Sequence, residues 1–119
     1  MSNRSTVIAQ ALLQGSWTTV YTVPINTQTA YASRDVISVT ISSIVLCNQH
    51  TGDLAYHIRF VPKGETAAAK HIVFHTRTLG AKATDIVSLG AGIQSGDMID
   101  MYAATADKIS VSIFGIETS

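Results

Sequence analysis

The four histidines are the side chains of this 119-residue chain that are best suited to metal binding or acid–base chemistry. His71 and His75 lie four positions apart, a spacing that brings two imidazoles to one metal ion on a helix. Their neighbours alternate as in a strand, however, where this spacing separates the two side chains by roughly 13 Å. No His-x-His pair is present. We therefore expect exposed strand-face histidines and no metal site, with a cross-strand pair such as His57 and His75 as the remaining alternative.

The acidic side chains are sparse and form no catalytic pattern. Most fall in turn-rich segments or at strand ends, where aspartate caps the backbone. Asp97 and Asp100 lack the ligand density of a calcium loop around them, and two carboxylates alone are weak evidence for a glycosidase. Nucleophile-elbow, phosphate-loop and His-Glu-x-x-His motifs are absent from the sequence. We predict no catalytic residue, no metal and no cofactor, and hence a protein that is not an enzyme.

The aromatic residues and the single cysteine favour packing over ligand recognition. Sugar-binding modules present stacked aromatic rings, whereas the one tryptophan and four tyrosines here mostly lie in or beside predicted strands. We expect these rings in the core or in an interface. Cys47 lies in an apolar run and is predicted to be a small buried hydrophobe.

The composition indicates a protein that associates with other proteins. Charged residues make up 13% of the chain and hydrophobic residues 46%, with equal numbers of acidic and basic side chains. A surface with few charges and no net repulsion is poorly protected against association, so we expect neighbouring subunits to cover much of it. The neutral balance argues against a nucleic-acid partner, which requires a basic face. No apolar run reaches membrane-spanning length and no export signal opens the chain, so we expect no membrane partner.

The stretch from Val36 to Asn48 organises the predicted fold. Apolar residues alternate with serine and threonine up to Ser42, the pattern of a strand with one wet face. The alternation then slips, and Ile44 to Cys47 is continuously apolar, as in a strand buried on both faces. One strand of this length would span roughly 40 Å. We therefore predict two strand halves joined at a bend or bulge that moves the chain between two sheets.

Shorter strands separated by turn residues follow the same logic. The Gly90–Asp97 segment is read as a turn region, and Ile86, with Val87 and Leu89 as further candidates, is expected in the core. The pattern predicts an all-β, single-domain Greek-key or jelly-roll β-sandwich of seven to eight strands. Besides the central stretch, the predicted strands are Trp17–Val23, Leu54–Val61, Lys70–Thr76, Thr84–Leu89, Met98–Ala103 and Ile109–Ile116.

The segment from Met1 to Gly15 has a different periodicity. Val7, Ile8, Ala11 and Leu12 fall at helical spacing, and Gly15 is a helix-stop residue. We predict a short helix or N-terminal arm at residues 1–15, separate from a β-sandwich domain at residues 16–119. A helix this short must pack on something, either its own sandwich or a partner.

Several segments together resemble small virion structural proteins of tailed bacteriophages, a group that includes capsid decoration (cement) proteins and domains of tail or fibre proteins. The resemblance extends from Trp17 to Glu117 and implies a β-sandwich, commonly trimeric, that is bound to other virion proteins and has no catalytic residues. The segments are Val20-Tyr-Thr-Val-Pro24, Ser43-Ile-Val-Leu-Cys-Asn48, Arg59-Phe-Val-Pro-Lys-Gly64, Gly96-Asp-Met-Ile-Asp-Met-Tyr-Ala103 and Val111-Ser-Ile-Phe-Gly-Ile-Glu117.

These observations lead to an expected function. We expect a capsid decoration protein, a homotrimer on the outer surface of the capsid that binds the major capsid protein or another virion protein. The residues expected at subunit or shell contacts are Val7, Ile8, Leu12 and Leu13. The alternatives are a tail, neck or fibre component, including a receptor-binding one, and a small metal-dependent jelly-roll enzyme.

Overall fold

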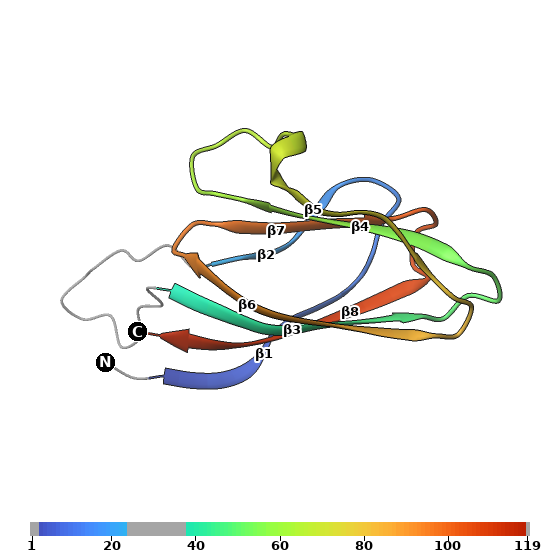
Figure 1. The fold of residues 1–119 in the computed structure, drawn as a ribbon, viewed down its shortest axis with the longest axis horizontal. Helices are drawn as coiled ribbons and strands as arrows, with labels where there is room; N and C mark the ends of the chain where they lie inside the picture. Colours follow the sequence, from blue (N-terminus) through green and yellow to red (C-terminus); the bar gives the residue numbers. More distant parts are fainter. Residues whose placement is uncertain (1–2, 24–37, 119) are drawn as a thin grey trace.

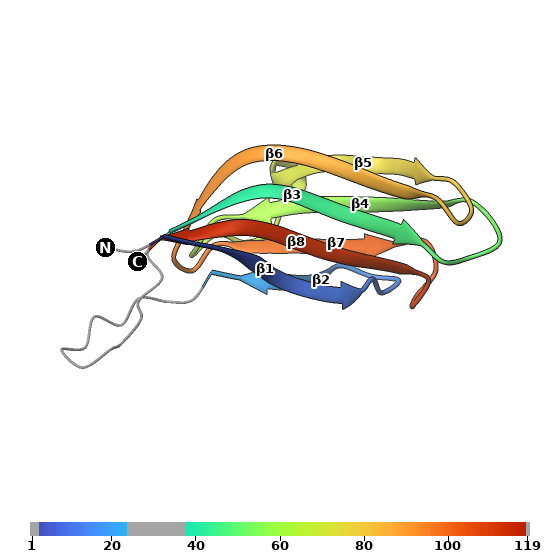
Figure 2. The same ribbon diagram turned by 90° about the horizontal axis from the view of Figure 1, so that it is seen from below.

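The computed structural model describes residues 3–23 and 38–118, which form two antiparallel β-sheets packed face to face (Figures 1 and 2). The polar segment Ile25–Asp35, which its sequence predicts to be a loop, lies outside this range. None of the described helical residues forms a helix long and apolar enough to cross a membrane. The elements are β1 (Asn3–Leu12), β2 (Thr18–Thr22), β3 (Ser38–Asn48), β4 (Leu54–Val61), the 3-10 turn η1 (Ala69–His71), β5 (Ile72–Leu79), β6 (Thr84–Gln94), β7 (Met98–Ala103) and β8 (Ile109–Thr118).

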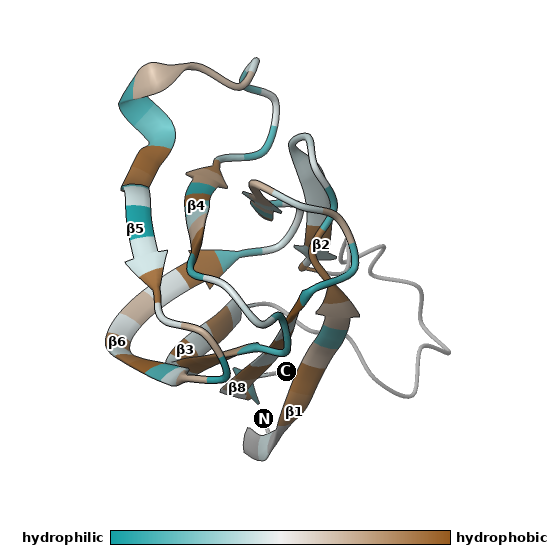
Figure 3. Cartoon of the chain, turned by 90° about the vertical axis from the view of Figure 1, so that its right-hand side faces the viewer, coloured by the Kyte–Doolittle hydropathy of each residue, from teal (hydrophilic) through white to brown (hydrophobic). Residues whose placement is uncertain are grey.

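The strand order defines an eight-stranded jelly roll. One four-stranded sheet has the order β1-β8-β3-β6 and the other the order β2-β7-β4-β5. Except between β4 and β5, each connection carries the chain from one sheet to the other, so strands adjacent in a sheet are mostly far apart in sequence. In Figure 3 the two sheets appear as separate layers. The predicted all-β jelly-roll sandwich is confirmed.

The core lies between the two sheets and is built mainly by residues that alternate along the strands. Along β8, for example, the residues that point inward are fully buried and the serines between them are partly exposed. Each fully buried aliphatic side chain contributes about 1.5–3 kcal/mol to folding. The largest fully buried side chains include Ile41, Ile44, Leu46, Tyr56, Ile58, Ile99, Met101, Ile109 and Ile113.

The central stretch forms one strand rather than two. The register of β3 with both neighbours shifts between Ile41 and Ser43, so a β-bulge is present where the sequence pattern slips. The predicted move to the other sheet is wrong, because both halves of β3 pair with the same two strands, β6 and β8. After the bulge the alternation resumes, with Ile44 and Leu46 buried and Val45 and Cys47 half-buried.

The predicted N-terminal helix is also wrong. Residues Asn3–Leu12 form β1, which pairs with β8 of the same sandwich. The register shifts between Val7 and Ala9, so Ile8 is an extra residue in the ladder. A bulge that breaks a two-residue period spaces the apolar residues of a strand like those of a helix, which explains the misleading pattern.

Strand β6 is longer than the sequence indicated. It runs through Gly90 and Gly92 to Gln94, and the turn before β7 contains Gly96, whose φ is +89°. The assignment of Gly90–Gly92 to a turn is therefore wrong. Ile86, expected in the core, is 64% exposed, whereas Val87 is buried, because Val87 and not Ile86 has the inward phase.

Candidate functional site

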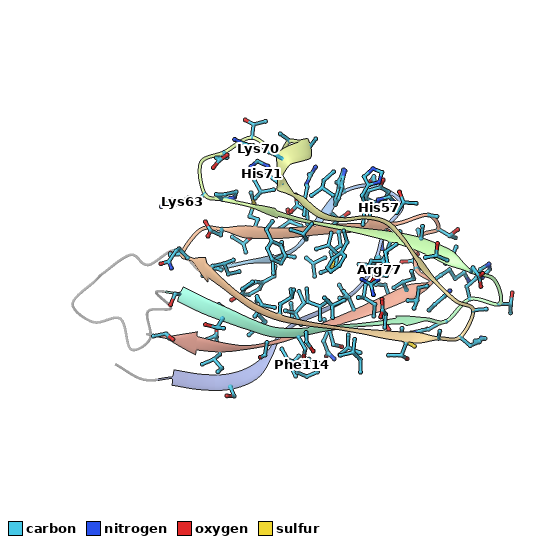
Figure 4. All side chains as sticks on the ribbon, viewed as in Figure 1. His57, Lys63, Lys70, His71, Arg77 and Phe114 are labelled. Carbon is cyan, nitrogen blue, oxygen red and sulfur yellow. The ribbon has the colours of Figure 1, made fainter. Side chains whose placement is uncertain are left out.

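The outer face of the β2-β7-β4-β5 sheet carries a cluster of aromatic rings, which we call the aromatic cluster: Trp17, His57, His75 and Tyr102. His57 on β4 lies directly opposite Tyr102 on β7, and their rings stack with centroids 4.0 Å apart and planes 4° from parallel. Trp17, which precedes β2, meets Tyr102 edge-on with centroids 4.6 Å apart. Figure 4 shows His57 on the outside of this sheet. Trp17 and Tyr102 remain partly exposed.

A fixed ion pair borders the aromatic cluster. The Arg59 Cζ atom lies 4.2 Å from the centroid of the Trp17 ring, a cation–π distance. The Nε and Nη2 atoms of Arg59 each lie 2.9 Å from Oδ2 of Asp100, the opposite residue on β7. Thr19 Oγ1 donates to the other oxygen of Asp100 at 2.8 Å. Both carboxylate oxygens of Asp100 therefore accept hydrogen bonds within the protein, an arrangement that does not suit a general acid or base.

His57 is held as a neutral imidazole. Its Nδ1 accepts a hydrogen bond from the backbone N–H of Thr76 at 3.0 Å, so the ring proton lies on Nε2. Burial lowers the pKa of His57 below its ordinary value, and the nearby His75 lowers that pKa further. The ring centroids of His57 and His75 are 5.4 Å apart, so the cross-strand pair left open by the sequence does form. The described residues nevertheless contain no group of three or more ligands suited to a metal ion.

His71, which lies four residues before His75, orders a loop. His71 lies in η1 and is buried, so its expected exposure on a strand face is wrong. Its Nδ1 accepts from the N–H of Ala68, and its Nε2 lies 3.1 Å from a Glu65 carboxylate oxygen. The hydrogen bond from His71, followed by the contacts with Lys70, lowers the pKa of Glu65. These contacts close the connection between β4 and β5.

Asp97 and Asp85 likewise make hydrogen bonds and ion pairs that stabilise the fold. Asp97 accepts the backbone N–H of Lys63 through Oδ1 and that of Gln94 through Oδ2, so it caps the turn as predicted. Asp85 accepts from the hydroxyl of Tyr56 at 2.6 Å and pairs with Arg77 at 3.1 Å. The hydrogen bond between Tyr56 and Asp85 links the two sheets. Within residues 3–23 and 38–118 no pocket is present.

The predicted contact residues do not share one surface. Val7 and Leu12 are 46% and 44% exposed on β1. Leu13 is 1% exposed and belongs to the core, and Ile8 is half-buried and packs against that core. Leu13 is therefore a core residue, and Val7 and Leu12 are the predicted residues whose side chains are nearly half exposed.

The outer face of the β1-β8-β3-β6 sheet is the second surface of interest, and we call it the uncharged face. The strand register arranges its outward residues in four rows across β6, β3, β8 and β1. The rows are Thr84-Cys47-Ser110-Leu12, Ile86-Val45-Ser112-Gln10, Ser88-Ser43-Phe114-Val7 and Gly92-Thr40-Ile116-Ser5. Gln10 Nε2 donates to Ser112 Oγ at 3.0 Å, in agreement with this arrangement. Figure 4 shows Phe114 on the side of the sheet that faces away from the sandwich interior.

None of the sixteen residues in these rows is charged, whereas the charged side chains described elsewhere lie in turns, on the other sheet or at sheet margins. Asp85 of β6, for instance, points inward and places no charge on this face, because it accepts a hydrogen bond from Tyr56.

The sequence alone did not predict the aromatic cluster or the uncharged face. His57 and Arg59, two residues apart on β4, share one face, and serines alternate with buried residues along β8. These patterns signalled the two surfaces, but β7, which pairs with β4, and β3, which pairs with β8, are not adjacent to them in the sequence.

Comparison with known proteins agrees with the fold. No family model matches this chain, and neither does any curated protein sequence. A chain in the structure of infectious bursal disease virus, Gx strain, superposes with a TM-score of 0.50 at 11% identity, covering 95% of this chain. A chain in the crystal structure of the T13 particle of that virus gives 0.53 at 10% identity and covers 97%. This chain spans only 32% and 31% of those chains. The similarity therefore concerns the jelly-roll fold.

Proposed function

We propose that this protein is a virion structural protein that acts by binding protein neighbours and is not an enzyme. The observation that carries the proposal is the uncharged face, a whole sheet surface with no charged residue on a jelly-roll sandwich. A water-exposed sheet normally carries charged side chains that keep it soluble and discourage association. The fold similarity to chains of a virus particle supports the proposal.

The more specific form of the proposal is a capsid decoration protein on the outer surface of the capsid. It forms a homotrimer and binds the major capsid protein or another virion protein, with Val7 and Leu12 contributing to subunit or shell contacts. Both side chains are nearly half exposed on the β1 margin of the sandwich. Apolar burial at a modest contact, repeated many times over a shell, would hold neighbouring shell subunits together.

Addition of the purified protein to particles assembled without it tests this function. We expect saturable attachment and, in an electron-microscopy map of the particle, density for the sandwich on the outer shell. The particles should also resist heat better after attachment. Density confined to the tail or neck would contradict the decoration role and leave the virion role, whereas no attachment to any particle part would contradict both.

The aromatic cluster favours a second candidate, a tail or fibre component that binds a receptor. Trp17 and Tyr102 are partly exposed rings beside Arg59, and aromatic rings next to a hydrogen-bond donor suit the apolar face and hydroxyl groups of a sugar. A glycan-array screen tests this candidate, with Trp17→Ala as the matched variant. A specific hit that is lost in Trp17→Ala would favour receptor binding, and a screen without hits would disfavour it.

A further inference from the structure

We propose that the uncharged face binds the uncharged face of a second copy of this chain, across a two-fold axis that runs along the strands. The proposal names a partner surface for the proposed virion role and rests on that role for its biological setting. The physical basis of the pairing does not depend on the virion role, because two copies of this chain can be tested for pairing in solution.

The lack of charge selects the partner. A charged side chain of another protein placed against the four rows would lose its hydration without gaining an opposite charge, which is costly. A suitable partner surface must therefore be uncharged as well. The chain itself supplies such a surface, and its serine and threonine hydroxyls can donate and accept hydrogen bonds across the contact.

The arrangement of large and small side chains makes the uncharged face complementary to itself. A two-fold rotation about an axis along the strands lays β6 of one copy over β1 of the other and β3 over β8, row upon row. Phe114 then lies over Ser43, and Val45 over Ser112. Val7 likewise lies over Ser88, because both belong to the same row. Bulky side chains thus meet small ones, as close packing of two sheets requires.

The burial of the face is half complete in the single subunit. Ile86 is 64% exposed and Val7 and Leu12 are nearly half exposed. The continuous apolar run through Val45 and Cys47 is typical of a strand buried on both faces, yet both side chains are only half-buried. A second copy stacked on this face would complete their burial.

The size of the face is sufficient for a specific contact. Four strands spaced about 4.8 Å apart, with about nine residues each rising about 3.4 Å, give a footprint of roughly 600 Å². Specific interfaces begin at about 1,200 Å² in total, or about 600 Å² on each partner. The pair would therefore be a modest one, with an affinity sensitive to a single substitution at its centre.

Sedimentation equilibrium of the full chain tests the pairing without any virus particle. We expect an even number of subunits. A hexamer would show that the proposed trimers pair, whereas a dimer would support the pairing and contradict the homotrimer. Ser112→Lys, at the centre of the face, should weaken pairing at least about ten-fold, since it buries an unpaired charge. Val73→Lys, at a half-exposed site on the other sheet, is the matched control and should pair normally. A mixture of Ser112→Lys with Ser112→Glu protein should regain pairing.

Cross-linking tests the orientation in a Cys47→Ser background. Gln10 and Ile86 share a row but lie three strands apart in one subunit, and the two-fold rotation brings Gln10 of one copy over Ile86 of the other. A mixture of Gln10→Cys and Ile86→Cys proteins should cross-link through a short bis-thiol reagent, while each variant alone should not. A monomer or bare trimer at all concentrations, or equal effects of Ser112→Lys and Val73→Lys, would overturn the pairing. Loss of pairing with intact attachment to particles would leave the virion role standing.

Discussion

The backbone N–H of Thr76 donates to Nδ1 of His57 at 3.0 Å, and this hydrogen bond ties the irregular middle of β5 to β4. Thr76 has a φ of +53°, an uncommon conformation for a residue with a side chain, and the register of β4 with β5 shifts between Tyr56 and Ile58, the interval that contains His57. A protonated His57 could not accept this bond. The contact therefore couples the protonation of one imidazole to the local backbone.

We predict that acid destabilises the protein through His57. The folded-state pKa of His57 is lowered from 6.5, so the unfolded chain binds this proton more readily than the folded chain. The stabilising contribution is complete above pH 6.5 and is lost as the pH falls from 6.5 through the folded-state pKa. Urea unfolding at pH 7.5 and at pH 5.5 should show this loss. His57→Gln, whose amide oxygen can still accept from Thr76, should show a smaller loss.

His50→Gln is the control for the acid effect. His50 lies in the connection between β3 and β4 and does not belong to the aromatic cluster, so His50→Gln retains His57 and should still lose stability in acid. An acid loss of the same size in His57→Gln and in the unmodified protein would show that another group is responsible.

The second prediction concerns a close backbone approach within the β1-β8-β3-β6 sheet. A Cβ atom on Gly115 would lie 2.6 Å from the carbonyl oxygen of Thr40 and 3.4 Å from a methyl group of Val39. Because the first obstacle is backbone, Gly115→Ala should destabilise the fold by about 1–3 kcal/mol. Gly90→Ala is the matched control, since a Cβ atom on this glycine of the same sheet would meet nothing within 4 Å. The free energy of unfolding should fall in the first variant and stay the same or rise slightly in the second.

The third prediction compares two tyrosine hydroxyls. Tyr56 donates to Asp85 across the two sheets, and Tyr56→Phe should cost about 1–2 kcal/mol because the carboxylate loses a short hydrogen bond. The buried hydroxyl of Tyr21 has no hydrogen-bond partner within the described part of the chain, and burial raises its pKa to about 12. Tyr21→Phe should therefore be neutral or slightly stabilising in the same denaturation experiment. Equal losses in the two variants would contradict this assignment of roles.

The elements of the fold were largely predictable, because alternation along a strand is a local property. The buried residues Val39, Ile41 and Ile113 could be read from the sequence in this way. Two bulges, at Ile8 and near Ser42, changed the phase of this pattern. One bulge made β1 resemble a helix, and the other made β3 resemble two strands in different sheets.

The candidate surfaces were less predictable, because they depend on which strands become neighbours. The stack of His57 on Tyr102 and the ion pair of Arg59 with Asp100 join β4 to β7, which the sequence order does not place side by side. The same holds for the uncharged face. The serines on β3 and β8 predicted a solvent-exposed face. The strand register was needed to show that no charged residue lies on this face across its four strands.

The last prediction separates a contact role of β1 from its structural role. The double variant Val7→Ser with Leu12→Ser changes two side chains that are nearly half exposed and preserves the pairing of β1 with β8. We expect it to fold normally and to attach weakly to particles. Deletion of residues 1–14 should instead destabilise the sandwich, because it removes a whole strand and the buried Leu13. Circular dichroism and thermal unfolding would report folding, and co-sedimentation with particles would report attachment. A truncated protein as stable as the full chain would contradict the structural role, and undiminished attachment of the double variant would remove Val7 and Leu12 from the contact.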